Sequence, residues 1–436
     1  YTAGYQWALH GNASSTNAPQ AWCVATGSGI LIADIDTGVD FGHPDLRGKL
    51  VAGAAFVSGN AQPAPDQTPD GTGQAAVMDD YGHGTMTTGI MVADTNNGYG
   101  MAAEAPDAKA LVMKVFSNKG GSNGYSAYDS DVAAAIYWSV QHGARVVNLS
   151  LGPVIPSILP GVTGDPIPAA VQWASQSGAA VAIASGNGAF DSGVTLPGQG
   201  ASYANLEPYA LVVGAMGHSG NLASYSQTGN VYAPGGDGGG GDPSSDILST
   251  YPTYTPSNPG LSGNVANAPF ALYDGTSFAT PYAAGTLALL MSHGMTAQQA
   301  RDQVLATSRS VGGRPVLDAA RALGGSCPAA SGGGSGGGTS AGGGGCCPSA
   351  SSSAASQAQP AAKPAAGPSP SSRPTGSPSP AAAPAADAPG AKPATVRTQA
   401  VEGAPRGLVV GLVALGAVCL LGALGWFTRE RFFTDR

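Results

Sequence analysis

The chain has 436 residues, of which 67 are glycine and 34 are proline, and only 10% are charged. This composition excludes a coiled coil or a charged helix bundle, because both need many Glu, Lys and Arg residues. The formal net charge of −8 argues against a protein that binds duplex nucleic acid, which requires a basic surface. The five cysteines lack the spacing of metal ligands and do not by themselves define a disulfide framework.

Composition divides the chain into a folded part and a tail. Residues 1–325 mix apolar runs with turn residues, at a length that fits one large domain. Residues 326–405 are rich first in Gly and Ser and then in Ala, Pro and Ser, with almost no large apolar side chain. Such a segment cannot offset its ordering entropy, so we predict a disordered linker. Cys346 and Cys347 within it are a candidate point of processing or lipid attachment.

The tail ends in a predicted transmembrane helix. Residues 407–427 contain no charge and would form a helix about 31 Å long, which matches the hydrocarbon thickness of a bilayer. The short tail, 428–436, carries Arg429, Arg431 and Arg436, so the positive-inside rule places it in the cytoplasm and the large domain outside. Nothing at Tyr1 resembles a signal peptide, and we expect that the N-terminus has been processed or omitted.

Within the large domain, predicted strands alternate with helices. The helix predicted over 130–143 has Ser130 as its N-cap and carries an apolar stripe of Val132, Ile136 and Val140. Short apolar runs predict strands at 29–36, 108–116, 145–151, 179–185 and 210–215. This alternation indicates an α/β fold with a mostly parallel central sheet and helices on both faces. Functional groups are then expected at the carboxyl ends of the strands.

Three motifs near such positions carry reactive side chains. They are Asp36-Thr37-Gly38, Gly82-His83-Gly84-Thr85 and Gly275-Thr276-Ser277. Each has an ordinary structural explanation, as a turn aspartate, a structural histidine or a helix-capping serine. Together they supply a carboxylate, a base and a hydroxyl, which are the three groups that nucleophilic acyl transfer needs.

The order Asp36, His83, Ser277 and the surrounding motifs resemble the subtilisin-like serine proteases (subtilases, peptidase family S8), in their thermitase and subtilisin branch. The resemblance spans about Gln6 to Leu323. The further motifs that carry it are His43-Pro44-Asp45-Leu46, Val146-Val147-Asn148-Leu149-Ser150-Leu151-Gly152 and Ala184-Ser185-Gly186-Asn187.

This resemblance implies a role for each matching residue. Asp36 would orient His83, His83 would accept the proton of Ser277, and Ser277 would form the acyl-enzyme. Asn187 would donate its amide to the oxyanion, although an asparagine between two glycines is also an ordinary turn residue. Polypeptide substrates would pair with the segment Ser150, Leu151 and Gly152, and their side chains would enter a pocket lined by Ala184, Ser185 and Gly186.

The resemblance also implies a structural calcium ion. Asp45 matches the family's carboxylate ligand. The Asn97 side chain and the carbonyls of Thr95, Tyr99 and Met101 match its further oxygen ligands. Gln6 is the candidate for an N-terminal ligand. The alternative is that residues 95–101 form a simple Asn-Asn-Gly turn without a metal.

The sequence departs from the family pattern beside the reactive residues. Met86-Thr87-Thr88-Gly89 stands where the family usually has His-Val-Ala-Gly, and Tyr282 stands where it usually has His. None of these positions carries a catalytic group, so the departures alter the packing behind the triad.

We therefore expect an extracytoplasmic serine endopeptidase that a C-terminal helix tethers to the cell membrane, with no organic cofactor. A processing protease like the membrane-anchored mycosins is an alternative, although the segment before His83 lacks their usual cysteine pattern. A catalytically silent binding module that retains the fold is a second alternative. The substrate preference, the activating prosegment and the oligomeric state stay open.

Overall fold

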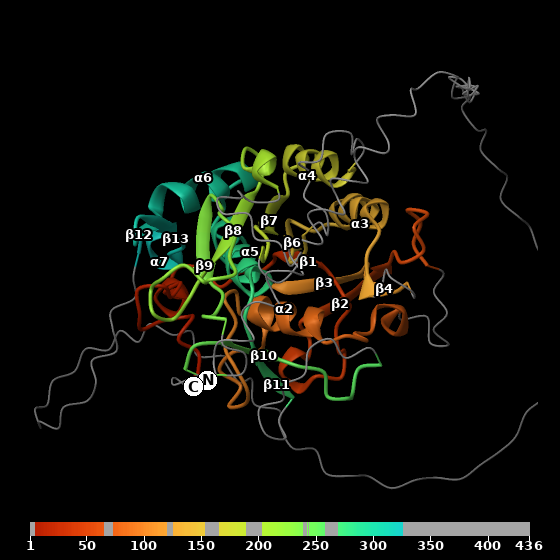
Figure 1. Cartoon of the computed structure of the whole chain (residues 1–436), viewed down its shortest axis with the longest axis horizontal. Helices are drawn as coiled ribbons and strands as arrows, with labels where there is room; N and C mark the ends of the chain where they lie inside the picture. Colours follow the sequence, from red (N-terminus) through yellow and green to blue (C-terminus); the bar gives the residue numbers. More distant parts are fainter. Residues whose placement is uncertain are drawn as a thin grey trace, which may run out of the picture. The chain divides into compact units, whose positions relative to one another are not determined.

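A nine-stranded sheet in the order β12-β13-β9-β8-β7-β6-β1-β3-β2 organises the part of the chain that the structure describes (Figure 1). All neighbouring strands in it are parallel except β12 and β13. Its strands are β1 (Leu31–Asp36), β2 (Leu50–Ala55), β3 (Lys109–Lys114), β6 (Val146–Leu149), β7 (Ala180–Ala184), β8 (Leu211–Met216), β9 (Val231–Pro234), β12 (Arg309–Val311) and β13 (Arg314–Val316). Two small antiparallel sheets pair β4 (Ser117–Asn118) with β5 (Tyr125–Ser126) and β10 (Ile247–Thr250) with β11 (Phe270–Tyr273).

This computed structural model describes residues 5–64, 73–119, 125–152, 165–188, 203–238, 242, 244–257 and 269–325. The predicted linker at 326–405, membrane span at 407–427 and tail at 428–436 lie outside these residues. Within the described ranges, no helix combines the length and the apolar character needed to cross a bilayer.

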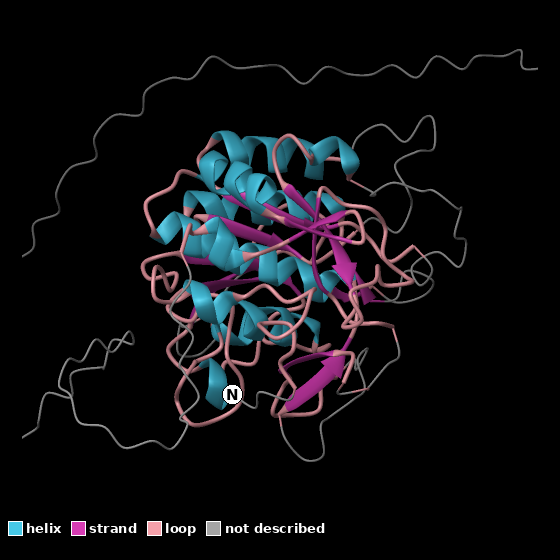
Figure 2. Cartoon of the chain, turned by 90° about the vertical axis from the view of Figure 1, so that its left-hand side faces the viewer, coloured by secondary structure: helices cyan, strands magenta, loops and turns pink. Residues whose placement is uncertain are grey.

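Helices cover both faces of the sheet, as the alternating pattern predicts (Figure 2). They are α1 (Ala18–Ala21), α2 (His83–Val92), α3 (Asp129–Gln141), α4 (Ile167–Gln176), α5 (Thr276–Ser292), α6 (Ala297–Thr307) and α7 (Ala319–Ala322). Because successive strand residues point to opposite faces, Ile32 of β1 packs in the core with α2 and α5, whereas Ile35 packs in the core with α3 and α4. The predicted α/β architecture with a mostly parallel sheet is confirmed.

The predicted elements match the structure except at one helix start. The five predicted strands correspond to β1, β3, β6, β7 and β8, and the predicted helix corresponds to α3. Ser130 is not its N-cap, as the sequence suggested, because the helix starts at Asp129 with Tyr128 in the capping position. The Ser130 hydroxyl instead donates to the Gly59 carbonyl oxygen in a neighbouring loop, at 3.3 Å.

Cys23 is disulfide-bonded, a feature that the cysteine spacing does not predict. The other four cysteines all lie outside the described residues. Disulfide bonds are characteristic of proteins that fold in an oxidising compartment.

Glu104 is a buried carboxyl group between the N-terminal segment and α5. Its side chain accepts hydrogen bonds from the hydroxyls of Thr16 and Thr286, each at 2.8 Å. Burial raises the pKa of Glu104 to about 8, although both hydrogen bonds act in the opposite direction. The folded protein therefore holds this carboxyl group neutral in a pH range where an exposed glutamate is ionised.

This buried carboxyl group predicts a loss of stability at alkaline pH. An unfolded glutamate releases its proton near pH 4.3, so Glu104 costs stability progressively as the pH rises from there to about 8. The variant Glu104→Gln stays neutral and should exceed the wild type in free energy of unfolding by roughly 5 kcal/mol at pH 9. Near pH 4 the two proteins should differ by less than about 1 kcal/mol. Urea unfolding at both pH values measures this difference, and parallel pH profiles would contradict the assignment.

Candidate active site

Asp36 and His83 meet at the carboxyl end of β1. Asp36 is the last residue of β1, and His83 is the first residue of α2. The His83 Nδ1 lies 2.8 Å from both carboxylate oxygens of Asp36. A neutral imidazole that donates from Nδ1 to a carboxylate has its Nε2 lone pair available as a base.

The close approach of α2 to β1 depends on Gly84. A Cβ atom at this position would lie 2.2 Å from the Gly38 carbonyl oxygen and 3.2 Å from the Asp36 Cβ. Any larger residue would therefore push His83 away from Asp36. The glycine after the histidine, which the sequence motif contains, is required by this packing.

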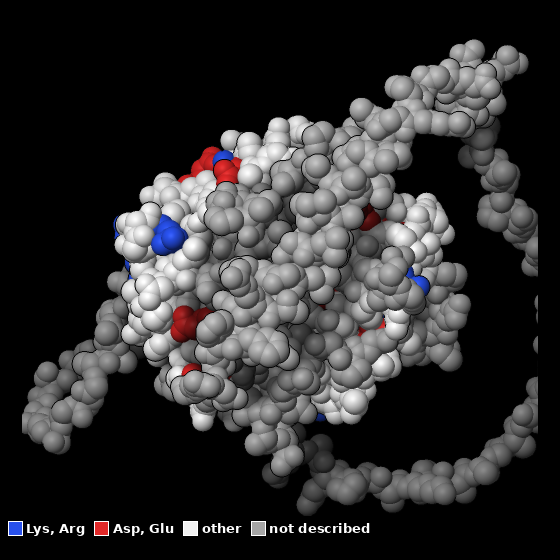
Figure 3. Space-filling model, in the orientation of Figure 1, with Lys and Arg blue, Asp and Glu red and all other residues white. Residues whose placement is uncertain are grey.

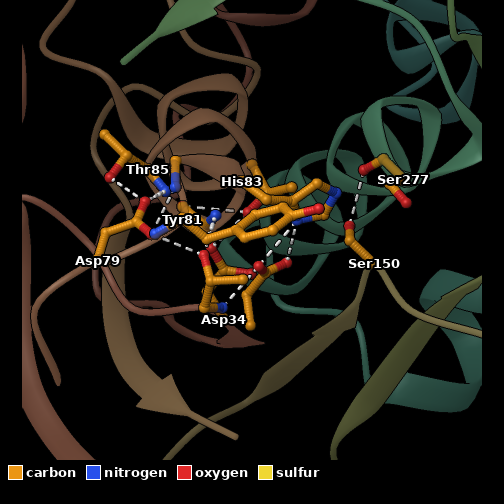
Figure 4. Close-up of polar contacts among 12 residues, drawn as sticks. Asp34, Asp79, Tyr81, His83, Thr85, Ser150 and Ser277 are labelled. Carbon is orange, nitrogen blue, oxygen red and sulfur yellow. Dashed lines mark hydrogen bonds and ion pairs between the residues drawn. The ribbon is translucent and has the colours of Figure 1, made fainter. Parts of the chain in front are cut away.

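Asp79 fastens the loop that carries His83. Its carboxylate accepts the backbone N–H groups of Tyr81, Gly82 and Thr85 at 2.8 to 3.0 Å. It also accepts the hydroxyl of Thr85 at 2.6 Å and that of Thr37, which directly follows Asp36, at 2.8 Å. One buried carboxylate thus holds the start of α2 to the end of β1 (Figure 4).

The His83 imidazole lies in a strongly negative environment. Burial opposes its charged form, but the charge and hydrogen bond of Asp36, together with smaller contributions from Asp34 and Asp79, more than offset burial. The pKa of His83 is therefore raised above that of an ordinary histidine. The imidazolium that forms during general base catalysis is stabilised in such a site.

Ser277 is the second residue of α5, where the helix dipole favours a developing negative charge. Pro281 lies four residues further on and has no N–H to donate to the Ser277 carbonyl oxygen, as an ordinary helical residue would. The Ser150 hydroxyl, just after β6, donates to that carbonyl oxygen instead, at 2.8 Å. Ser150 therefore connects the end of β6 to the backbone of Ser277.

The elements that carry His83 and Ser277 pack against each other. The ring of Phe278, which follows Ser277, lies 5.3 Å from the His83 ring between centroids. Figure 4 shows His83, Ser150 and Ser277 in one group. The structure thus brings the three predicted reactive residues to the carboxyl edge of the sheet, from β1, α2 and α5.

Asn187 is bound to the start of α5. Its Oδ1 accepts the backbone N–H and the hydroxyl of Thr276, both at 2.9 Å. A Cβ atom on Gly275 would lie 3.6 Å from the Asn187 Nδ2, so the amide nitrogen lies beside the residues that precede Ser277. This orientation is compatible with donation to an oxyanion at Ser277.

The predicted substrate-binding residues lie at or just after the carboxyl ends of β6 and β7. Leu151 is buried and Gly152 is exposed, two and three residues after the end of β6. Ala184 ends β7, and the Ser185 hydroxyl donates to the Gln227 carbonyl oxygen at 3.0 Å. The Gly186 N–H donates to the Thr276 hydroxyl at 3.3 Å, which places this segment beside the start of α5.

The predicted calcium ligands converge in part. Asp45 is fully buried and accepts the Asn97 side-chain amide and the Met101 N–H, both at 2.9 Å. In the same loop the Thr95 hydroxyl accepts the Ala103 N–H, and the Tyr99 N–H donates to Asn97 Oδ1. In the described residues, no cluster of three or more His, Cys, Asp or Glu side chains has the arrangement of a metal site.

Sequence reasoning missed two carboxylates of this site, Asp34 and Asp79. An acidic residue four positions before a Gly-His-Gly helix start is a signal that could have indicated Asp79, because it can cap the exposed N–H groups. An acidic residue in the middle of the apolar run of β1 is a similar signal for Asp34.

An Asp-His pair at the edge of a parallel sheet, next to a serine at a helix start, is the arrangement found in serine hydrolases. The family described as Peptidase_S8, Subtilase family, matches residues 27–332. The chain therefore belongs to the subtilase family and is a serine endopeptidase.

Individual relatives agree with this assignment. Thermitase from Thermoactinomyces vulgaris is 37% identical over 299 residues, which are 68% of this chain and 87% of that protein. Among solved structures, a protease from Pseudoalteromonas arctica has a TM-score of 0.57 at 27% identity and covers 73% of this chain and 96% of that one. MycP1 without its N-terminal propeptide has a TM-score of 0.54 at 24% identity, over 71% of this chain and 94% of that one, which shows a common fold.

The contacts of Asp79 predict that it supports both the fold and the site. The variant Asp79→Ala leaves three backbone N–H groups and two hydroxyls without their acceptor, and we expect a loss of about 3 kcal/mol in the free energy of unfolding. Asp79→Asn keeps one acceptor oxygen and should fall between this variant and the wild type. Urea unfolding of the three proteins tests this order, and equal stability of all three would contradict it.

Proposed function

We propose that this peptidase cleaves polypeptides through an acyl-enzyme on Ser277, with His83 as general base and Asp36 as its orienting carboxylate. The observation that carries the proposal is the contact of His83 Nδ1 with both Asp36 oxygens, beside the helix start that bears Ser277. This contact fixes the tautomer in which Nε2 can accept a proton from a serine hydroxyl.

The proposed reaction follows the usual two steps of acyl transfer. His83 Nε2 takes the proton of the Ser277 hydroxyl as Ser277 Oγ attacks the substrate carbonyl carbon, and later returns the proton to the leaving amine. Water then attacks the acyl-enzyme, with His83 again as the base. The Ser277 backbone N–H at the start of α5 and the Asn187 amide would stabilise the oxyanion in both steps.

Peptide substrates would bind by extended pairing with the backbone at Ser150 to Gly152. Ala184 to Gly186 would face the side chain next to the cleaved bond. Both segments directly follow or end parallel strands whose carboxyl ends lie at the same edge of the sheet as Asp36. Backbone pairing does not depend on the side chains of the substrate, so we expect a broad substrate range. A broad range supports a degradative role.

We also propose that the domain acts outside the cytoplasmic membrane and is tethered by residues 407–427. The disulfide of Cys23 supports an oxidising compartment, and the uncharged run supports the tether. A dedicated processing protease is the second candidate, because an uncharged span after a proline-rich linker is the arrangement of membrane-anchored mycosins. Cleavage of a peptide library at many sites supports the degradative role, whereas cleavage at one motif supports the processing role.

A fluorophosphonate probe tests the proposed nucleophile and the tether together. Washed membranes from cells that make the whole chain should contain a labelled peptidase, with the label on Ser277 in peptide mass spectra. The variant Ser277→Ala should lose the label, and a chain that stops at 405 should carry the label in the soluble fraction. Asn187→Ala should keep the label and lower kcat about 10²- to 10³-fold, the magnitude found for such a donor in subtilisin.

Two outcomes would contradict these proposals separately. Absence of label in a folded wild-type chain would contradict the nucleophile and support the silent binding module. Labelled full-length chain that washes off the membranes would contradict the tether alone.

We further propose that calcium binds at Asp45. This buried carboxylate has no ion-pair partner among the described residues and is satisfied only by neutral donors from Asn97 and Met101. A Cβ atom on Gly100 would lie 2.2 Å from Asp45 Oδ2, so the loop 95–101 wraps closely around the carboxylate. The Asn97 side chain and the carbonyls of Thr95, Tyr99 and Met101 would complete an oxygen site, in which the ion stabilises the fold.

Calcium removal tests this site. Saturating Ca²⁺ should raise the free energy of unfolding by about 2.7 kcal/mol at 100 times the dissociation constant, relative to a chelator. In Asp45→Asn this calcium-dependent increment should disappear, whereas in Asp107→Asn, a change at an exposed carboxylate, it should persist. Equal stability of the wild type in calcium and in chelator would contradict the site.

A further inference from the structure

Asp34 is a second buried carboxylate behind the Asp36-His83 pair. It lies on β1 two residues before Asp36, so both side chains project from the same face of the strand. Only 1% of Asp34 is exposed. Its Oδ2 accepts the hydroxyls of Thr87 at 2.9 Å and Thr88 at 2.6 Å, which lie in α2 one turn after His83.

The other oxygen of Asp34 leads toward Ser277. Asp34 Oδ1 accepts the Asn148 side-chain amide at 2.9 Å, across the paired strands β1 and β6. The same amide nitrogen donates to the Ser150 hydroxyl at 3.0 Å, and that hydroxyl donates to the Ser277 carbonyl oxygen at 2.8 Å. Asp34 is therefore connected to the helix of His83 on one side and to the backbone of Ser277 on the other.

Two of the sequence departures in α2, at positions 87 and 88, are explained by this carboxylate. Thr87 and Thr88 stand where the family pattern has Val and Ala, and their hydroxyls are two of the three donors to Asp34. A buried carboxylate without such donors would be strongly unfavourable, whereas an aliphatic residue in β1 would need none. The three polar residues therefore form one unit that packing alone does not require.

We propose that Asp34 is a positioning residue of the peptidase site. It fixes the position of α2 relative to the Ser277 backbone and adds negative charge next to His83. This inference rests on the proposed roles of His83 and Ser277. It differs from them in naming a residue that touches neither substrate nor the reacting atoms.

The charge on Asp34 changes near neutral pH. Burial and then the neighbouring Asp36 raise the pKa of Asp34 to about 7, although its three hydrogen bonds act in the opposite direction. Asp34 in turn contributes to the raised pKa of His83. Ionisation of Asp34 should therefore delay the loss of the His83 proton and broaden its titration.

The charged groups around this unit are few. Asp36 lies on the same strand, and His83 and Asp79 lie at the start of α2 and in the loop before it. From β3, the Lys114 ammonium contacts the Thr37 carbonyl oxygen and forms an ion pair with Asp80. Asn148 of β6, Ser150 just after β6 and Ser277 of α5 face the site and are uncharged. Removal of the Asp34 charge should therefore act on His83 without a compensating partner.

The test is the titration of His83 in the full chain carrying Asp34→Asn. Asparagine can accept from Asn148 and donate to the threonine hydroxyls, so the network is kept while the charge is lost. The midpoint of the His83 NMR titration should fall by about half to one pH unit, and the acid limb of kcat/KM should move to lower pH by the same amount. The His83 signal is assigned by its loss in His83→Ala.

Two further variants make the test specific. Glu104→Gln removes another buried carboxyl group that two threonine hydroxyls hold, and it should leave the His83 midpoint unchanged. The triple change Asp34→Val, Thr87→Val and Thr88→Ala removes the charge while restoring apolar packing, and it should shift the midpoint as Asp34→Asn does. This variant answers the question if Asp34→Asn fails to fold.

The outcomes separate this inference from the proposed function. A His83 midpoint within about 0.2 units of the wild type in the charge-removed variants would overturn the role of Asp34, whatever their activity. A shifted midpoint in a chain that neither reacts with the fluorophosphonate nor cleaves peptides would support the action of Asp34 on His83 while it overturns the catalytic roles.

Discussion

The site depends on the place of β1 in the sheet. This strand pairs with β3 on one side and with β6 on the other, so its carboxyl end is held from both sides. Asp36 at that end is consequently rigid before His83 reaches it. The contact between the two side chains then fixes where α2 starts, and α2 packs against α5, which carries Ser277. The reactive groups are thus positioned by a strand register that apolar packing maintains.

Many carboxyl groups in the described part of the domain are buried. On the face shown in Figure 3, the described charged side chains are scattered singly or in small groups. Several carboxyl groups are instead buried, namely Asp34, Asp36, Asp40, Asp45, Asp79, Glu104, Asp131, Asp246 and Asp318. Threonine and serine hydroxyls and backbone N–H groups supply many of their hydrogen bonds, so most of these carboxyl groups do not need a lysine or an arginine. A chain with few basic residues can therefore bury many acids.

The central strands and the reactive residues at their ends could be predicted from the sequence, because apolar runs and the Gly-His-Gly motif are local signals. It did not predict the hairpin of β12 and β13, whose strands are three residues long and polar in part, such as Arg309 and Arg314. The connections made by Asp34 and Asp79 were also missed. The Asp34 network depends on contacts between segments distant in sequence, as between Asp34 and Asn148, and one sequence does not reveal which strands are neighbours. Asp79 mainly contacts the loop and helix start that follow it, and its distant partner is Thr37.

The proline in α5 has a consequence for how this site can vary. Because Pro281 offers no N–H to the Ser277 carbonyl oxygen, the Ser150 hydroxyl fills a vacancy that the proline creates. A serine lost at 150 alone would leave the carbonyl oxygen without that donor, and a proline lost at 281 alone would make two donors compete for it. The two positions, on different elements and 131 residues apart, are therefore energetically coupled in the sense of a double-mutant cycle. Substitutions at one should be accepted mainly in backgrounds where the other has already changed.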